Sequence, residues 1–247
     1  MGKIVLSEKP FLSIQGEGPT MGMRSVFIRF KFCNLACTWC DSKFTWSKSS
    51  STHEEDILLY ANAQEFVKEF KTLLIGIGPQ NIIFTGGEPL MNQTEIMEII
   101  SELERIEPAC LDENTYEIET NGTIFITDEF RTFLYDRKIL FNISPKTQFS
   151  LKLPDVMENI RRIRDEAHIL KFVDDGTEKT RSIIEDFVHN CYNEHLLFGK
   201  DVFIMPECQT REEHLANFER TMKFCFDHNW EFSPRLHILL WNKKRGV

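Results

Sequence analysis

Short apolar runs that end in polar or glycine-containing turns recur along this chain, with amphipathic segments between them. Such runs predict strands, because a buried strand is a short apolar stretch bounded by turn signals. Strands are expected at 24–32, 81–85, 116–119, 140–143, 169–173 and 202–205.

Helix start signals fall between these runs. Asn62 with Glu65, and Asn92 with Glu95, each combine an N-cap residue with an acidic side chain three positions later. The expected helices run over 62–74 and 92–105, with further helices from near 127 and after 210. The polar stretch 41–56 is expected to be a loop, and the chain from about Leu236 an extended tail.

The alternation of strands and helices predicts an α/β fold with a parallel sheet and right-handed crossovers. About six strand–helix units are too few to close an eight-stranded barrel, so we expect a partial, open β/α barrel of about six parallel strands. The site of such a fold lies at the carboxyl ends of its strands. Residues 1–247 are expected to form a single domain.

The composition narrows the class of protein. The formal net charge is −9 and no basic stripe is present, which argues against a nucleic-acid partner. No apolar stretch is long enough to span a bilayer and the N-terminus lacks a secretory signal, so no membrane partner is expected. Seven cysteines, an odd number, favour a reducing cytoplasm over a disulfide framework.

Three of these cysteines lie within eight residues, in the order Cys33-Asn-Leu-Ala-Cys37-Thr-Trp-Cys40. A four-iron cluster needs one ligand per iron, and this spacing offers three thiolates with no fourth cysteine nearby. One iron would keep an open coordination position, where chemistry can occur. Cys33, Cys37 and Cys40 are therefore the candidate cluster ligands.

Two other interpretations of these cysteines remain. Cys37 and Cys40 alone fit half of a zinc site or a thioredoxin-like redox pair. A zinc site needs another ligand at short spacing, and the next histidine, His53, lies in the expected loop. A redox pair gives no role to Cys33. The spacing of all three cysteines favours the cluster.

Polar or glycine-containing segments follow the expected strands, at the edge where a barrel site lies. Gly86 and Gly87 lack a β-carbon, so a ligand could approach their backbone, and Glu88 could accept hydrogen bonds from an ammonium group. Ser144-Pro-Lys146 is expected to be a rigid turn with a cationic donor. The other strand-end segments are Glu119-Thr-Asn-Gly122 and Met205-Pro206-Glu207.

The cysteine motif followed by Thr85-Gly-Gly-Glu-Pro89 resembles the radical S-adenosylmethionine superfamily. Within it, further motifs from about residue 11 onward resemble the 7-carboxy-7-deazaguanine synthase family. These are Gln15-Gly16-Glu17-Gly18, Cys40-Asp41-Ser42 with Phe44-Thr45-Trp46, Glu119-Thr-Asn-Gly122, Ser144-Pro-Lys146, and Leu236-His237 with Lys244-Arg245-Gly246-Val247. The resemblance implies a lyase that converts 6-carboxy-5,6,7,8-tetrahydropterin to 7-carboxy-7-deazaguanine with loss of ammonia, in deazapurine (queuosine) biosynthesis.

The resemblance also implies three cofactors, namely a [4Fe–4S] cluster, S-adenosylmethionine (SAM) and Mg²⁺. The family commonly has Thr after Cys-Asp, with its hydroxyl on Mg²⁺; Ser42 stands there in this chain and keeps a hydroxyl. Cofactor contacts are expected at Trp39, Cys40, Asp41, Gly87, Glu88, Ser144, Pro145, Lys146, Met205, Pro206, Glu207 and Cys208.

The implied substrate has a carboxylate, which calls for a cation, and Arg29 offers a bidentate fork. Its aminopyrimidine edge presents N–H donors, which carboxylate and amide oxygens satisfy. Glu119 is the candidate catalytic residue, expected to assist the radical step or proton movement near C6. Substrate contacts are expected at Ile14, Gln15, Gly16, Glu17, Arg29, Thr85, His237 and the carboxylate of Val247.

Partners and alternatives complete the prediction. The resemblance implies a homodimer and an electron donor of the flavodoxin or ferredoxin type. A glycyl-radical-enzyme activase shares the cysteine spacing but acts on a protein, and it lacks the pairing of the 15–18 motif with the 244–247 tail. That activase and a non-enzymatic zinc-binding module are the alternative functions.

Overall fold

In the computed structural model, which describes residues 2–47, 57–76, 81–110, 114–197, 201–242, 244 and 246, ten strands form one sheet. Its order is β10-β9-β8-β7-β6-β5-β3-β1-β4, with β2 paired to β3 beside this path. Neighbouring strands pair in parallel from β3 through β5, β6, β7, β8 and β9 to β10. In contrast, β1 and β2 pair antiparallel with β3, and β4 pairs antiparallel with β1. The bounds are β1 Ile4–Leu6, β2 Phe11–Ile14, β3 Arg24–Phe30, β4 Leu58–Tyr60, β5 Asn81–Gly86, β6 Thr115–Thr120, β7 Ile139–Ile143, β8 Ala167–Asp174, β9 Val202–Pro206 and β10 Glu231–Phe232.

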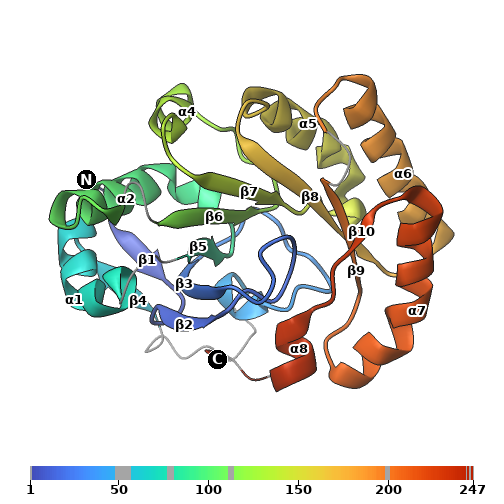
Figure 1. Ribbon diagram of the computed structural model, residues 1–247, viewed down its shortest axis with the longest axis horizontal. Helices are drawn as coiled ribbons and strands as arrows, with labels where there is room; N and C mark the ends of the chain where they lie inside the picture. The colour runs from blue at the N-terminus through green and yellow to red at the C-terminus, as the bar shows by residue number, and fades with distance from the viewer. Residues whose placement is uncertain are drawn as a thin grey trace.

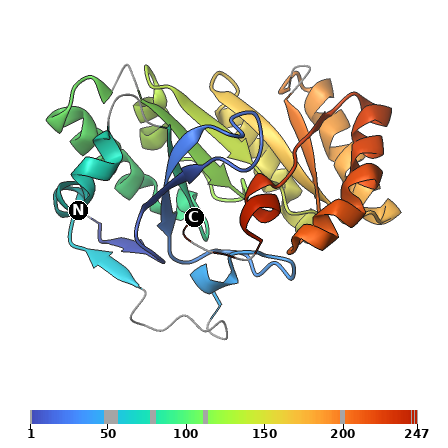
Figure 2. The same cartoon turned by 60° about the horizontal axis from the view of Figure 1, so that its bottom comes forward.

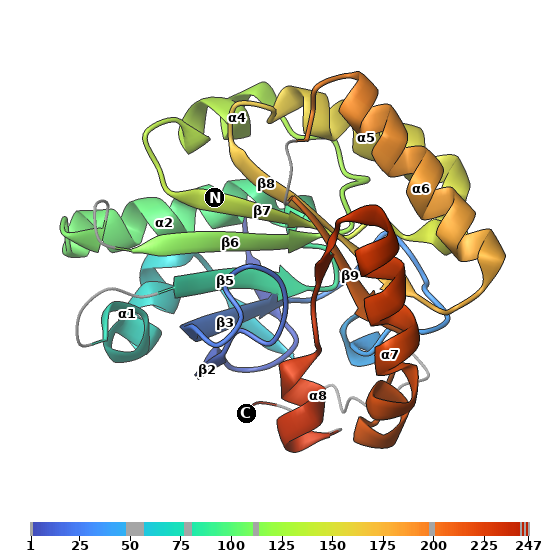
Figure 3. The same cartoon turned by 45° about the vertical axis from the view of Figure 1, so that its right-hand side comes forward.

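Helices cover the outer face of this sheet (Figure 1), and they form an arc from α2 to α7 around strands β6 to β9 (Figure 3). The helix bounds are α1 Ala63–Ile75, α2 Gln93–Ile106, α4 Asp128–Leu134, α5 Leu153–Arg162, α6 Glu178–Asn193, α7 Arg211–His228 and α8 Leu236–Trp241. All of the expected strands are present, and the path of paired strands ends at β4 and β10 without closing. The predicted partial β/α barrel is therefore confirmed.

Side chains alternate between the two faces of the parallel strands, as the two-residue period of a strand requires. Phe84, Ile118 and Phe141 face the helices and are fully buried in the hydrophobic core. Residues of the opposite parity form a polar inner face, and those that line a cavity there include Arg29, Thr85, Glu119, Asn142 and Lys171. The sheet thus separates an apolar core from a polar site.

The predicted helix starts are mostly as expected. Asn62 caps α1 by accepting a hydrogen bond from the Glu65 amide at 2.9 Å, and Thr210 begins α7 with a capping box. Asn92 occupies the predicted N-cap position of α2, but it does not cap the helix through its side chain. Its side chain makes no cap bond, because the 3₁₀ turn η3 (Pro89–Asn92) runs directly into α2.

The prediction of an extended C-terminal tail is also wrong, since Leu236–Trp241 forms helix α8. Ile238 is buried, and Arg211 of α7 donates hydrogen bonds to the carbonyl oxygens of Leu239 and Leu240 at 2.6 and 3.0 Å. These last-turn carbonyls thereby gain the partners that a helix end otherwise lacks.

The predicted loop 41–56 is described in part. Lys43–Thr45 form one 3₁₀ turn, η1, and 48–56 lie outside the described residues. Within the described ranges, no helix has the length and apolar character needed to cross a membrane.

Candidate functional site

A cavity of about 440 Å³ opens at the carboxyl ends of the parallel strands, where the fold predicts a site. Cys33, Cys37 and Cys40 all line it. Figure 2 shows the segment that carries them (light blue) and helix α8 (red) at the same end of the sheet. The cavity therefore brings together segments from both halves of the sequence.

The cysteine segment turns sharply away from β3. Phe32 has a φ of 71°, and its amide donates a hydrogen bond to the Thr45 carbonyl at 2.9 Å. The Gly87 amide donates to the Phe30 carbonyl at 3.1 Å, and a β-carbon on Gly87 would lie 1.7 Å from the Phe32 oxygen. The chain's own backbone fills the space where a β-carbon would lie, so the turn itself requires glycine here, and the expected approach of a ligand stays a prediction. Gly87 still lines the cavity.

Glu88 is fully buried and is not among the residues that line the cavity, so its expected contact with a bound ammonium group stays a prediction. Its carboxylate accepts hydrogen bonds from the Leu90 amide at 3.0 Å, the Asn121 amide at 2.8 Å and Thr120 Oγ1 at 2.5 Å. Burial raises the pKa of Glu88, and these donors act in the opposite direction. Glu88 therefore joins the ends of β5 and β6 next to the cysteine segment.

Two of the cysteine sulfur atoms receive hydrogen bonds from their own segment. The Leu35 amide donates to Cys33 Sγ at 3.4 Å, and Trp46 Nε1 donates to Cys40 Sγ at 3.4 Å. Burial raises the pKa of Cys33 to about 11 and also raises the pKa of Cys37. Metal binding would therefore displace protons, and the N–H donors would stabilise the resulting charge on sulfur.

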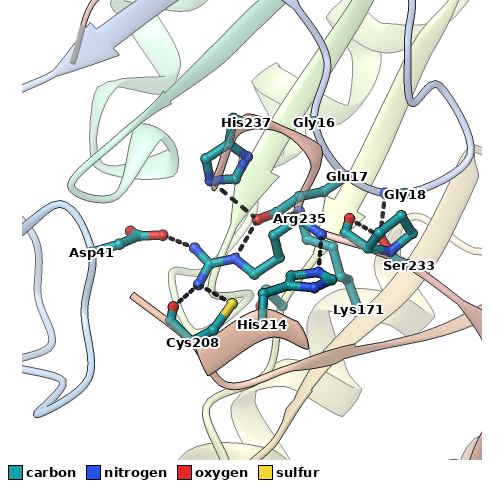
Figure 4. Close-up of polar contacts among 12 residues, drawn as sticks. Gly16, Glu17, Gly18, Asp41, Lys171, Cys208, His214, Ser233, Arg235 and His237 are labelled. Atoms are coloured by element: carbon teal, nitrogen blue, oxygen red, sulfur yellow. Dashed lines mark hydrogen bonds and ion pairs between the residues drawn. The ribbon is translucent and has the colours of Figure 1, made fainter. Parts of the chain in front are cut away.

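A network of charged side chains connects the segment after β2 with the segment before α8 (Figure 4). Glu17 pairs with Arg235 Nε at 3.0 Å and with Lys171 Nζ at 2.6 Å. Arg235 also pairs with Asp41, directly after the cysteine segment, and donates to the Cys208 carbonyl at 2.6 Å. The network thus reaches from the cysteines to the inner face of the sheet.

Electrostatics keep this network charged. Burial opposes ionisation of Glu17, but the charges of Lys171 and Arg235 outweigh it and hold the pKa of this carboxyl well below its usual value. Burial also acts against the charge of Lys171, yet Glu17 and Glu119 raise the pKa of this amine. His237 Nε2 lies 4.0 Å from Glu17, and burial lowers the pKa of its imidazole. A neutral imidazole therefore lies beside the charged groups at neutral pH.

Glu119 lies at the inner end of this network. Its Oε1 accepts a hydrogen bond from Gln15 Nε2 at 3.2 Å and lies 3.4 Å from Lys171 Nζ. Its Oε2 accepts a hydrogen bond from Thr85 Oγ1 at 2.9 Å. The predicted site residues Gln15, Thr85 and Glu119 are distant in sequence, and the fold brings them into direct contact.

Two cations contribute to other parts of the lining. Arg29 donates from Nε to Glu8 at 2.7 Å, and its guanidinium carbon lies 5.9 Å from the ring centroid of Phe44. Lys146 donates to Ser144 Oγ at 2.8 Å and lies 5.4 Å from the Trp39 ring centroid. Lys146 is thus next to the cysteine segment, whereas Arg29 lies on the sheet.

Most of the site residues predicted from the sequence line the cavity. They are Ile14, Gln15, Gly16, Glu17, Arg29, Cys33, Cys37, Trp39, Cys40, Asp41, Ser42, Thr85, Gly87, Glu119, Ser144, Lys146, Met205 and His237. The expected cofactor contacts that do not line it are Glu88, Pro145, Pro206, Glu207 and Cys208. Of these, Cys208 instead accepts hydrogen bonds from Arg235. Val247 lies outside the described residues.

The prediction missed several polar residues of the lining. Asn142 and Lys171 interrupt otherwise apolar strand segments, and this interruption was a usable signal because a polar side chain inside a buried strand needs a partner. Arg235 had no comparable signal, since its partners lie far away in the sequence.

A family model described as the Radical SAM superfamily matches residues 27–199 of the chain. The chain belongs to the radical SAM superfamily. Curated relatives match nearly the whole length of the chain. The 7-carboxy-7-deazaguanine synthase of Halobacterium salinarum is 30% identical, covering 94% of this chain and 88% of its own. The enzyme of the same name from Clostridium acetobutylicum is also 30% identical, covering 96% of both.

Solved structures of other proteins share the fold. The crystal structure of QueE from Escherichia coli superposes with a TM-score of 0.63 at 20% identity and covers 95% of both chains. The structure of anSMEcpe with bound AdoMet gives a TM-score of 0.56 at 19% identity, over 82% of this chain and 58% of that one. At these identities the two comparisons describe the fold alone.

The residues present fit the cluster that the radical SAM superfamily implies. Three cysteines line the cavity, and within the described part of the chain no fourth cysteine does. Among the described residues, no three His, Cys, Asp or Glu side chains are placed to hold a single metal ion. A [4Fe–4S] cluster takes one thiolate per iron, so three cysteines that line one cavity fit it and leave one iron open.

Proposed function

We propose that this radical SAM protein converts 6-carboxy-5,6,7,8-tetrahydropterin to 7-carboxy-7-deazaguanine, with loss of ammonia, in deazapurine biosynthesis such as that of queuosine. Relatives that carry the synthase name over nearly the whole chain support this proposal. The observation that carries it is a cavity in which three cysteines lie together with a polar inner sheet face. That arrangement suits a radical cofactor beside a polar heterocycle.

The cofactor side of the cavity would be built by the cysteine segment and the turn after β7. When bound, the cluster and SAM supply abstraction of a hydrogen atom from carbon. Cys33, Cys37 and Cys40 would hold the cluster. Ser144 and Lys146, together with the Trp39 ring, would bind SAM, because they offer a hydroxyl, a cation and an aromatic surface at one place.

The substrate side would be the inner face of the sheet. Arg29 would bind the substrate carboxylate, since a guanidinium presents parallel N–H groups to it. Gln15, Glu17 and Thr85 would contact the ring. Glu119, held by hydrogen bonds from Gln15 and Thr85, would lie beside the reacting carbon and exchange a proton there. His237 and the Val247 carboxylate remain further proposed contacts.

A magnesium site at Ser42 belongs to the same proposal. Ser42 lines the cavity, and its Oγ lies 3.6 Å from Cys40 Sγ. Magnesium prefers oxygen ligands and keeps several waters, so one hydroxyl beside the substrate is a suitable ligand. Ser42→Ala should lose stimulation of turnover by Mg²⁺ selectively. Equal rates with and without the metal in both proteins would contradict this assignment.

The remaining proposals concern the cellular setting. We expect a homodimer, which light scattering on purified protein measures. We also expect a flavodoxin- or ferredoxin-type reductant, which reduction kinetics with each purified donor compare, and a cytoplasmic location, which fractionation tests.

An anaerobic turnover assay tests the proposed function. Reconstituted protein would receive the carboxypterin, SAM, Mg²⁺ and a reductant, and mass spectrometry would follow 7-carboxy-7-deazaguanine. Product is expected with the wild type and not with Cys40→Ala. SAM cleavage without this product, or cleavage that depends on an added protein substrate, would instead favour the activase alternative.

A further inference from the structure

Asn142 on β7 is a fully buried side chain whose Nδ2 and Oδ1 have no hydrogen-bonding partner among the described residues. The buried Asn159 is different. Its Nδ2 donates to the carbonyls of Gly122 and Ile124 at 2.7 and 2.8 Å, and its Oδ1 accepts from the Ile126 amide at 3.0 Å. An unpaired buried amide disfavours folding, so Asn142 calls for a partner that the described chain does not supply.

The position of Asn142 indicates where that partner lies. The side chain lines the cavity from the inner face of the sheet, and its residue pairs in register with Glu119 on β6. Gly18, with a φ of 70°, lies against the amide, because a β-carbon there would be 3.3 Å from Nδ2. Asn142 therefore lies among the proposed substrate contacts, whereas Ser144, two residues further along, contacts Lys146 near the cysteine segment.

The chemistry of Asn142 and its neighbours indicates which chemical group of a ligand would bind there. Glu17 and Glu119 each form an ion pair with Lys171. Asn142 adds a neutral donor and a neutral acceptor on one planar group. The complement of such a group is a lactam edge, in which a ring N–H lies beside a carbonyl oxygen, and a pterin has one.

We propose that Asn142 is a specificity-determining residue that binds the lactam edge of the pterin ring through Nδ2 and Oδ1 together. This inference rests on the proposed function, because it takes the pterin as the ligand. A site built to hydrogen-bond a polar edge loses affinity strongly when its partner is removed, since the buried groups of the ligand are then unpaired.

Asn142→Leu tests this assignment, because leucine has nearly the same size and no polar atom. Asn159→Leu is the matched control, a buried asparagine on α5 whose amide is fully paired. Three quantities would be measured on anaerobically reconstituted protein without reductant, so that no turnover occurs. They are the melting temperature without ligands, the Kd for 6-carboxy-5,6,7,8-tetrahydropterin and the Kd for SAM.

The expected result separates binding from structure. Asn142→Leu should melt at or above the wild-type temperature, bind the pterin roughly 10- to 100-fold more weakly, and bind SAM as the wild type does. Asn159→Leu should melt well below the wild type. If Asn142→Leu also melts well below the wild type, fails to fold, or loses SAM affinity instead, Asn142 has a structural or cofactor role and the proposal is overturned.

Asn142→Ser provides a second, smaller change that keeps a hydroxyl in the cavity. Unchanged pterin affinity in this variant and in Asn142→Leu would also overturn the proposal. If the wild type itself neither binds nor converts the carboxypterin, the proposed function fails. If the wild type does both and the Asn142 variants match it, only the inference about Asn142 fails.

Discussion

Arg235 and Asp41 lie 194 positions apart in the sequence and form an ion pair beside the cavity. The same guanidinium donates from Nε to Glu17 at 3.0 Å and from Nη1 to the Cys208 carbonyl at 2.6 Å. One arginine therefore joins the segment after the cysteines, the segment after β2 and the segment after β9. The cofactor side and the substrate side of the cavity are held in one arrangement by this side chain.

Arg235→Met should destabilise the protein by about 3 kcal/mol, because it leaves the buried Glu17 with one cationic partner fewer. Arg235→Lys should destabilise the protein less than Arg235→Met, because it keeps the positive charge. Some loss should remain, because lysine lacks the fork of donors. Urea unfolding at neutral pH measures both. Arg161→Met is the matched control, an exposed arginine paired with Glu194, and should change stability by about 1 kcal/mol or less. Equal losses in Arg235→Met and Arg161→Met would contradict a special role for Arg235.

Glu17 gives the stability a defined dependence on pH. Its pKa is held well below the usual value in the folded protein, so the folded state binds this proton less readily than the unfolded chain does. The stabilisation from Glu17 is therefore complete above the unfolded pKa of about 4.3 and is lost as the pH falls below it. Urea unfolding from pH 3 to pH 7 should show a decline below about pH 4.3 that is shallower in Glu17→Gln.

The exposed Glu129 of α4 supplies the control for this measurement. Glu129→Gln should keep the wild-type decline, because this side chain is in solvent. An identical decline in the wild type and Glu17→Gln would show that Glu17 is not held as an ion in the folded state.

Glu88→Gln distinguishes two roles of Glu88. One is the structural role that its hydrogen bonds indicate, and the other is the SAM contact expected from the sequence. The new amide would place an N–H group against three donors, so unfolding should become easier by about 1–3 kcal/mol. Chemical denaturation and SAM binding would be measured on the same preparation. Unchanged stability with a large loss of SAM affinity would support Glu88 as a direct contact.

The strands that carry the site could be predicted because each joins an apolar run to a clear turn signal. Strands β1, β2, β4 and β10 were not expected, since they have two to four residues and derive their pairing from the rest of the sheet. Helix α8 was missed for a related reason. Its last carbonyls are satisfied by Arg211, a partner on α7 that no local signal shows.

The sequence predicts which residues belong to the site better than it predicts the direction of their side chains. The cysteines could be singled out by their spacing and Glu119 by its position at a strand end, whereas Gln15 and Thr85 were expected only from the family resemblance. The direction of the Glu88 side chain could not be predicted, because it depends on donors at the end of β6 and in η3 that only the folded chain brings together. Lys171 could have been predicted as a site residue, because a charged residue within an apolar strand is a signal in itself.

The central claim is that three thiolates hold a four-iron cluster with one open iron beside the polar inner face of the sheet. The most direct test is the metal content and electron paramagnetic resonance spectrum of reduced, anaerobically reconstituted protein, before and after addition of SAM. The account predicts about four irons per chain and a spectrum that changes on SAM addition. Zinc in place of iron, or a cluster spectrum that SAM leaves unchanged, would contradict it.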